Sequence, residues 1–367
     1  MRPRARRQES STMIRGGHSL HIGGTLLPAL VALTVALLAC AGPALAEKTD
    51  IVYLRNGDRV TCEIKKLERG RLKVSTDSMS TVYIEWKDIL RLSSKALYIV
   101  EMESGTRFEG ILADTGRDGE LVLRHEGQEQ LVSMAAVVWV DPLKLDANRI
   151  KRWDGSVSAG FDSSKANSDT SLTASFDARR RAEDFQLNFN GSIYSRSQDG
   201  AEDSLRANFG TVYRGLLEDR WYWAALGAVE RNDELGMDLR TLGGGGYGRF
   251  LVQTGRSLWS ATGGLVVVNE QRAGDEPAET NLEGLLNTEY EFFTYDTPKT
   301  TLTTSLTVFP SITDAGRVRA DLEIGLRREL VTDLFIELSV YDSYDSRPPE
   351  DGTGNDYGIV TSLGYTF

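Results

Sequence analysis

The chain of 367 residues carries 42 basic and 53 acidic residues, which gives a formal net charge of −11. A protein this acidic lacks the basic surface that a nucleic-acid backbone requires, so no nucleic-acid partner is expected. Two cysteines and three histidines leave little material for disulfide or metal chemistry. The length favours more than one domain.

Residues 1–46 have the pattern of a signal peptide. Arginines between Arg2 and Arg15 precede an apolar stretch at 26–41, and Ala44-Leu45-Ala46 is a small-x-small cleavage site. Two alternatives remain open: an uncleaved membrane anchor, and a lipoprotein cut that would leave Cys40 as a lipidated N-terminus. The signal-peptide cut and the lipoprotein cut both imply export through the inner membrane.

Residues 47–141 contain two copies of one unit, at 50–93 and 97–141, offset by about 48 residues. Each copy opens with an apolar strand that ends before a glycine, Gly57 in the first and Gly105 in the second. Short strands between Gly and Asp turns predict a small all-β repeat domain of the SH3-like or Sm-like kind. We expect a periplasmic structural or docking module for another periplasmic protein.

Two smaller features complete this part of the chain. Pro142 ends the last apolar strand, and residues 142–152 are predicted to be a linker. Cys62 is the only cysteine that remains after a cut at Ala46, so no disulfide can form within the mature chain. It lies on an apolar strand, where a small core residue is expected.

Residues 153–367 divide into about twelve segments of roughly ten residues with alternating polarity, the length that a tilted strand needs to cross a bilayer. In the segment 334–344, Leu334, Ile336 and Leu338 would face lipid while Glu337 faces the lumen. The connections are alternately short and longer. The pattern predicts an all-β fold, a transmembrane antiparallel β-barrel of about 12 strands that follows the small repeat domain.

A soluble β-sandwich with the same alternation is the alternative to a barrel. Aromatic residues at strand ends favour the barrel, because such residues form girdles at membrane interfaces. They are Trp153, Trp221, Trp223, Trp259, Tyr290 and Phe292. The run Gly243–Gly246 falls inside a strand, and no Lys-Ser/Thr pair follows it, so it predicts a bend or a close packing point and not a phosphate loop.

Charged residues at the inward positions are the candidate lumen residues. Two interpretations stay open: the charges pair with one another to fill the interior, or they line a narrow polar channel with a weak ion preference. The residues are Arg206, Arg214, Glu283, Glu289, Arg317, Arg319, Asp321, Glu323 and Glu337, with Arg179, Arg240, Arg327, Asp177 and Glu291 beside them.

The chemistry of hydrolases is missing from the predicted barrel. The histidines are His18, His21 and His125, so no imidazole base is available there, and we expect a non-enzymatic protein without catalytic residues, cofactor or metal. The carboxylate pairs Asp233-Glu234 and Asp275-Glu276 are compatible with weak Ca²⁺ binding or with solvated loop charge.

The last segment carries a predicted assembly signal. Leu363, Tyr365 and Phe367 alternate with smaller residues and would form the apolar face of the closing strand. A tail of this kind resembles the signal that is read by the barrel-assembly machinery during insertion.

The segment from Tyr341-Asp342-Ser343-Tyr344 through Pro348-Pro349, together with the closing Leu363–Phe367, resembles the YdiY-like family of salt-induced outer-membrane proteins. These proteins are grouped under a domain of unknown function. Two further strands resemble this family, the one that starts at Trp153 and the one that contains Trp221-Tyr222-Trp223. The resemblance therefore covers roughly 153–367. It implies an outer-membrane barrel and carries no catalytic residues.

These features together predict an outer-membrane β-barrel of a Gram-negative envelope with its N-terminal domain in the periplasm. A narrow polar channel or an envelope structural component is the leading function, and a membrane anchor for the periplasmic module is the alternative. The expected partners are outer-membrane lipid and lipopolysaccharide, the barrel-assembly machinery, and either a periplasmic protein or a small polar solute.

Overall fold

The computed structural model describes residues 48–143, 153–164, 169–198, 204–272, 277–295, 298–348 and 354–366. The predicted signal peptide with Cys40, most of the predicted linker, Asp275-Glu276 and Phe367 lie outside the described residues. Within the described ranges, no helix is long and apolar enough to cross a membrane.

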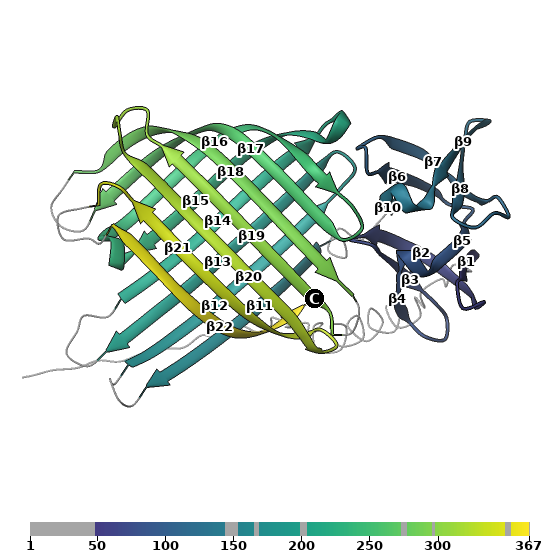
Figure 1. Ribbon diagram of the computed structural model, residues 1–367, viewed down its shortest axis with the longest axis horizontal. Helices are drawn as coiled ribbons and strands as arrows, with labels where there is room; N and C mark the ends of the chain where they lie inside the picture. The colour runs from purple at the N-terminus through teal and green to yellow at the C-terminus, as the bar shows by residue number, and fades with distance from the viewer. Residues whose placement is uncertain are drawn as a thin grey trace, which may run out of the picture. The chain divides into compact units, whose positions relative to one another are not determined.

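The first ten strands form one antiparallel sheet system (Figure 1). They are β1 (Asp50–Leu54), β2 (Arg59–Glu68), β3 (Arg71–Ser75), β4 (Thr81–Glu85), β5 (Ile89–Ser93), β6 (Leu97–Met102), β7 (Arg107–Asp114), β8 (Glu120–His125), β9 (Gln128–Ser133) and β10 (Val137–Pro142). A 3₁₀ turn precedes the last strand of each group of five, η1 (Trp86–Asp88) before β5 and η2 (Met134–Ala136) before β10. The same order of elements therefore occurs twice.

The two five-strand units close in the same way and share one core. In each, the last strand pairs with the first, β5 with β1 and β10 with β6, and the units join where Val140 of β10 pairs with Leu67 of β2. The Trp86 indole of η1 donates a hydrogen bond of 2.6 Å to the Met134 carbonyl of η2. Each unit is thin for a core of its own, and packing them together gives one continuous apolar cluster.

A buried carboxylate ties the two units together. Asp50 on β1 accepts hydrogen bonds from the Ile64 backbone N–H (2.7 Å), the Ser94 hydroxyl (2.5 Å) and the Tyr98 hydroxyl on β6 (3.1 Å). Burial raises the pKa of the Tyr98 hydroxyl, so it remains a donor. Three donors on one carboxylate compensate for its removal from water.

Cys62 is fully buried in this core and should be chemically silent in the native protein. Burial, with a smaller effect of Asp50, raises the pKa of its thiol from 9.0 to about 12. The folded pKa exceeds the unfolded one, so this contribution to stability is complete below pH 9 and is lost as the pH rises toward 12. We expect a disulfide reagent at about pH 8 to label Cys62 only in denaturant, and the Cys62→Ala variant to show a smaller alkaline loss of stability. Rapid labelling of the native protein would contradict this.

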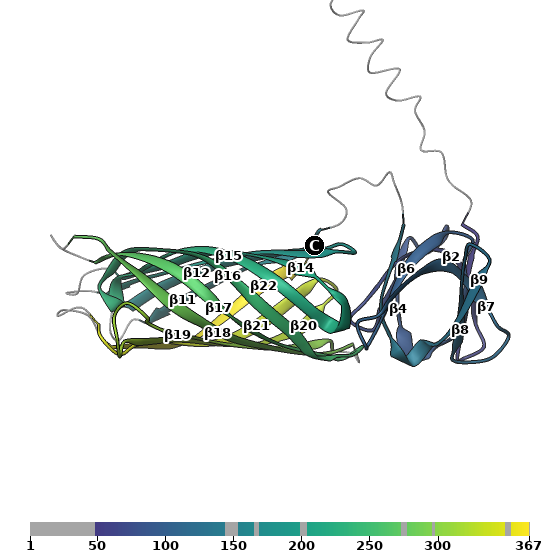
Figure 2. The same ribbon diagram turned by 90° about the horizontal axis from the view of Figure 1, so that it is seen from above.

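The remaining twelve strands form a closed antiparallel barrel in chain order, β11 to β22, with β22 pairing back to β11 (Figures 1 and 2). The predicted fold class is confirmed. The strands are β11 (Trp153–Ser164), β12 (Asp169–Arg181), β13 (Phe185–Gln198), β14 (Ser204–Leu216), β15 (Trp221–Asn232), β16 (Met237–Gln253), β17 (Ser257–Arg272), β18 (Glu279–Thr294), β19 (Thr300–Pro310), β20 (Val318–Val331), β21 (Leu334–Asp345) and β22 (Asn355–Thr366).

The barrel has two different ends. The connections after β12, β14, β16, β18 and β20 are short turns, and we call this the short-turn end. At the opposite end the connections are mostly longer, and we call it the long-loop end. These connections follow β11, β13, β15, β17, β19 and β21. β16, β17 and β18 are the longest strands and extend beyond the predicted segments at the long-loop end.

Side chains alternate between an apolar outer surface and the interior. On β17, Leu265 and Val267 are each 52% exposed, whereas Val266 and Val268 between them are at most 1% exposed. A strand turns successive side chains to opposite faces, so a closed sheet turns one set outward and the other into the lumen.

The aromatic residues that the sequence assigned to girdles gather at one end only. Trp221, Trp223, Trp259 and Tyr290 project outward near the short-turn end. Outward rings contact one another across neighbouring strands there, as Tyr213 does with Trp223 in a tilted arrangement with ring centroids 5.1 Å apart. An amphipathic belt of this kind suits a membrane interface.

Candidate functional site

Inward side chains of the barrel strands surround a central cavity of about 690 Å³. Six of the predicted lumen residues line it: Arg206, Arg214, Glu289, Asp321, Glu323 and Glu337. The alternation of each strand places them there, because they occupy the same face as the other inward positions.

The cavity has a polar wall and an apolar wall. Asn188, Asn190 and Asn208 on β13 and β14 supply amide groups. Inward apolar residues of β15, β16, β18 and β19 also line it: Leu226, Leu242, Leu285 and Phe309. The lumen is therefore amphipathic, which is common for ligand pockets and unusual for a purely aqueous pore.

Two lumen carboxylates lie near guanidinium groups without a direct ion pair among the described residues. Asp321 and Glu323 occupy successive inward positions of β20 and form no ion pair with any described basic residue. Other lumen charges do pair, as in Arg214 with Glu289 at 2.7 Å and Arg327 with Glu337 at 3.0 Å.

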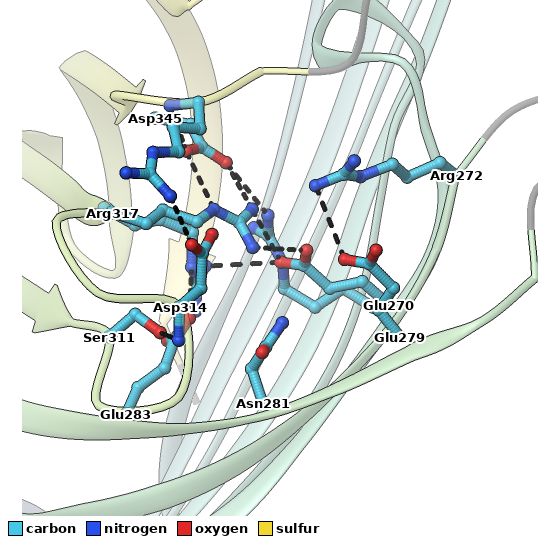
Figure 3. A network of polar contacts seen from close by, with 12 residues as sticks. Glu270, Arg272, Glu279, Asn281, Glu283, Ser311, Asp314, Arg317 and Asp345 are labelled. Atoms are coloured by element: carbon cyan, nitrogen blue, oxygen red, sulfur yellow. Dashed lines mark hydrogen bonds and ion pairs between the residues drawn. The ribbon is translucent and has the colours of Figure 1, made fainter.

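A buried network of ion pairs crosses the barrel at the long-loop end (Figure 3). Arg317, at 2% exposure, donates to both oxygens of Glu270 (2.8 and 3.2 Å) and to both oxygens of Asp345 (3.1 and 2.5 Å). Arg240 donates to Glu270 from the other side at 2.7 Å. The network joins two pairs of neighbouring strands that are not adjacent to each other, β16 with β17 and β20 with β21, and Arg317 lies directly before β20.

Three further contacts reinforce this closure. Arg319 on β20 donates to Glu283 on β18 at 2.6 Å, and both side chains are buried. Arg206 on β14 pairs with Asp356 on β22 at 3.2 Å, and Asn232 at the end of β15 donates to the same carboxylate at 2.9 Å.

Bidentate, water-excluded arginine contacts are the strong form of the ion pair. Here they connect distant walls of the sheet, so they hold the long-loop end in a narrow arrangement. A pore open along its axis would need water and solute to pass between these groups, and in this conformation the groups are in direct contact with one another.

The structure thus divides the predicted lumen residues between two places. Glu283, Arg317 and Arg319 belong to the network at the long-loop end, and the other six line the cavity. Of the flanking candidates, Arg179, Arg327, Asp177 and Glu291 also line the cavity, whereas Arg240 joins the network.

Glu270, Asp345, Asp356 and Asn232 were absent from the candidate lumen residues of the sequence analysis. A signal for two of them was present: Glu270 and Asp345 continue the inward parity of β17 and β21 by one further step. Extending the alternation past the last apolar residue would have placed both inside the barrel.

The carboxylate pair Asp233-Glu234 lies in the 3₁₀ turn η5 (Asp233–Leu235) after β15. Asp233 pairs with Arg231 at 2.8 Å and accepts the Leu205 backbone N–H at 2.9 Å. The assembly-signal residues Leu363 and Tyr365 lie on the outer surface, at 50% and 52% exposure.

The fold is similar to several solved barrels. The chain is 8% identical to a NanC porin structure, covering 58% of this chain and 98% of that chain with a TM-score of 0.35. It is 8% identical to a bacterial polysaccharide outer membrane secretin, covering 59% and 97% with a TM-score of 0.32. It is 10% identical to a KdgM porin in complex with disordered oligogalacturonate, covering 59% and 99% with a TM-score of 0.29. No curated protein sequence matches the chain.

A closed antiparallel sheet with an apolar outer surface and a charged interior defines the class of membrane-type β-barrels. Residues 157–367 match the family described as "Protein of unknown function, DUF481", and the chain belongs to this family. The narrower resemblance to salt-induced YdiY-like proteins stays a prediction.

Proposed function

We propose that this protein is an outer-membrane β-barrel whose lumen is a narrow polar channel, held closed at the long-loop end in the conformation described. The observation that carries the proposal is the cavity itself: an interior lined by charged and amide side chains, inside a sheet whose outer surface is apolar.

The orientation follows from the two ends. Barrels of the outer membrane place short turns in the periplasm and longer loops outside. The first residue of β11 and the last of β22 are both at the short-turn end, so the preceding repeat domain would lie in the periplasm. Outer-membrane lipid, lipopolysaccharide and the barrel-assembly machinery are the proposed partners of the barrel.

Asp321 and Glu323 set the proposed selectivity. Carboxylates at the wall of a narrow lumen raise the local concentration of cations and repel anions. A small cation or a small polar solute with positive charge is therefore the preferred permeant.

Single-channel recording on the refolded full chain tests this proposal. We expect rare, small openings with cations more permeant than anions, and a reduction of that preference by about two-fold or more in the Asp321→Asn/Glu323→Gln double variant. Glu289→Gln, which changes a carboxylate already paired with Arg214, is the matched control. If neither the wild type nor any variant conducts in any voltage range, the proposed channel function is wrong.

The second candidate function is a membrane anchor for the periplasmic repeat domain. Its support is the continuous apolar core of β1 to β10, which gives that domain a fold of its own. Affinity capture with the full chain, compared with the barrel alone, distinguishes the two: a partner retained only by the full chain would favour the anchor.

A further inference from the structure

The repeat domain contacts the short-turn end of the barrel, and residues 48–367 form one compact unit. Glu101 on β6 carries one part of this contact. Glu101 is 3% exposed, and its carboxylate accepts hydrogen bonds from Arg181 at the end of β12 (2.7 Å) and from Gln253 at the end of β16 (2.5 Å). Arg107 of the repeat domain donates to the same carboxylate at 3.0 Å. A buried carboxylate needs such donors, and two of the three belong to the barrel.

The segment around the β2–β3 turn of the repeat domain forms a second group of contacts with the barrel. Arg69 pairs with Glu291 on β18 at 2.5 Å, and its guanidinium lies over the Phe293 ring at 5.7 Å from the centroid. Lys66 on β2 pairs with Asp154 on β11 at 2.5 Å. By strand order, β16 and β18 lie across the closed sheet from β11 and β12. The contacts of the repeat domain therefore reach opposite sides of the short-turn opening.

Arg69 and Val138 of the repeat domain are among the residues that line the central cavity. Val138 forms a small buried cluster with Ile99 and Trp139, separate from the core of the domain. The Arg181 guanidinium of the barrel lies over the Trp139 ring at 5.0 Å from its centroid. An apolar cluster outside the core of a domain marks a surface that another part of the protein covers. The repeat domain thus forms part of the cavity wall on the short-turn side.

The backbones of the repeat domain and the barrel also approach each other closely at two turns. A Cβ at Gly70, in the β2–β3 turn, would lie 2.4 Å from the Gly255 carbonyl oxygen in the turn after β16. A Cβ at Gly105, in the β6–β7 turn, would lie 2.5 Å from the backbone nitrogen of Arg220 in the turn after β14. Backbone atoms cannot rotate away, so the contact has no room for a methyl group at either turn.

The contact has the composition of a reversible interface. Charged side chains supply most of it, and the continuous apolar core of the repeat domain consists of residues of that domain alone. Polar interfaces between the domains of one chain resemble those of transient complexes, and movement of one domain against the other is the usual expectation. The repeat domain can therefore separate from the barrel without losing its own core.

We propose that the repeat domain is an autoinhibitory cap of the barrel: docked, it closes the lumen at the short-turn end, and separated from the barrel, it opens that end. This rests on the proposed channel function and adds its regulation. Buried ion pairs cross the long-loop end, so the docked protein holds a cavity that is closed at both ends. Separation of the cap gives solutes on the short-turn side access to this cavity.

Thiol labelling of the cavity from solution is the direct test. In a Cys40→Ala/Cys62→Ala background of the full chain, Asn190→Cys places a single thiol in the cavity, where the Asn190 side chain is exposed to the lumen. The probe is a charged methanethiosulfonate reagent, which is added to refolded protein in detergent. We expect the Gly70→Ala/Gly105→Ala double substitution, which obstructs docking, to raise the labelling rate at least about five-fold.

Gly57→Ala/Gly119→Ala is the matched control for the docking variant. Gly57 and Gly119 hold the positions in one repeat unit that Gly105 and Gly70 hold in the other, and all four have positive φ. A Cβ at Gly57 or Gly119 would meet nothing within 4 Å, so the control carries similar backbone strain and leaves the barrel contact free. We expect the control to be labelled at the wild-type rate. Equal labelling rates for the two double variants would overturn the cap.

Zero-length crosslinking shows whether the docking variant acts through the contact itself. A carbodiimide joins a lysine to a carboxylate that touches it, and Lys66 touches both Asp154 of the barrel and Glu68 of its own domain, each at 2.5 Å. We expect the wild type and the control to form both products. The docking variant should lose the product with Asp154 and keep the product with Glu68. A wild type that forms no product with Asp154 would overturn the docked state.

Single-channel recording distinguishes failure of the cap from failure of the channel. We expect the docking variant to open at least about five-fold more often than the control. Faster labelling of the docking variant without conductance in any variant would reject the channel and support the cap. Equal labelling and equal conductance of the two variants would reject the cap and support the channel. Heat-dependent gel mobility shows that the barrel of each variant is folded, so a misfolded barrel is not mistaken for an uncapped one.

Discussion

Replacing Arg317 by methionine is expected to lower the free energy of unfolding of the barrel by about 3–5 kcal/mol, because it leaves buried carboxylates without their cation. Arg317 bonds to Glu270 and Asp345 at once. Without it, the Asp345 carboxylate keeps the Arg347 backbone N–H at 3.0 Å, and its nearest remaining cation among the described residues is Arg240 at 4.0 Å. Denaturant titration of the protein in detergent or lipid, followed by tryptophan fluorescence, measures the change.

The same variant should also loosen the closure of the long-loop end. We expect longer and more frequent openings in single-channel records, since the network no longer joins β17 to β21 through one guanidinium. Arg347→Met is the matched control: Arg347 pairs with Asp314 at the same end of the barrel, but its side chain is 51% exposed, and an exposed pair contributes little. An unchanged unfolding midpoint for Arg317→Met would contradict the structural role of the network.

Replacing Gly244 by alanine should impair folding of the barrel by about 1–3 kcal/mol, the usual cost of forcing atoms into a packed region. A Cβ at Gly244 would lie 2.2 Å from the Leu265 carbonyl oxygen and 2.7 Å from the Val266 Cα on the neighbouring strand. Both obstacles are backbone, which cannot rotate away. The yield of folded, heat-modifiable protein after refolding is the measurement.

Gly243→Ala is the control for this substitution. The two glycines are adjacent on β16 and equally poor strand formers, but a Cβ at Gly243 would meet nothing within 4 Å. We expect this variant to fold as well as the wild type or slightly better. If the two variants fold equally well, the close approach of β16 and β17 is not a constraint on the barrel.

The glycine run illustrates what a sequence can reveal. Its position within a strand predicted a bend or a close packing point, and the structure places it where β16 approaches β17 on the inner side of the sheet. The alternation of polarity likewise predicted a closed barrel of about twelve strands, because membrane and lumen impose opposite demands on successive residues.

The pairing of charges across the lumen could not be predicted in this way. Arg317 and Glu270 are 47 residues apart, and they meet only because closure of the sheet and the stagger of its strands bring β17 and the start of β20 together. A local sequence pattern specifies neither the closure of the sheet nor the stagger of its strands. Of the two interpretations of the lumen charges, pairing is seen for Arg317, Arg319 and Glu283, and the channel interpretation stays a prediction.

The central claim is that the chain forms a membrane-spanning barrel in the outer membrane, and gel mobility of the outer-membrane fraction with and without heating tests it most directly. Closed barrels resist detergent until heated, so the account predicts that the protein is recovered in this fraction and changes its apparent mass on boiling. A protein with the same mobility before and after boiling, or one recovered in the soluble periplasmic fraction, would contradict it.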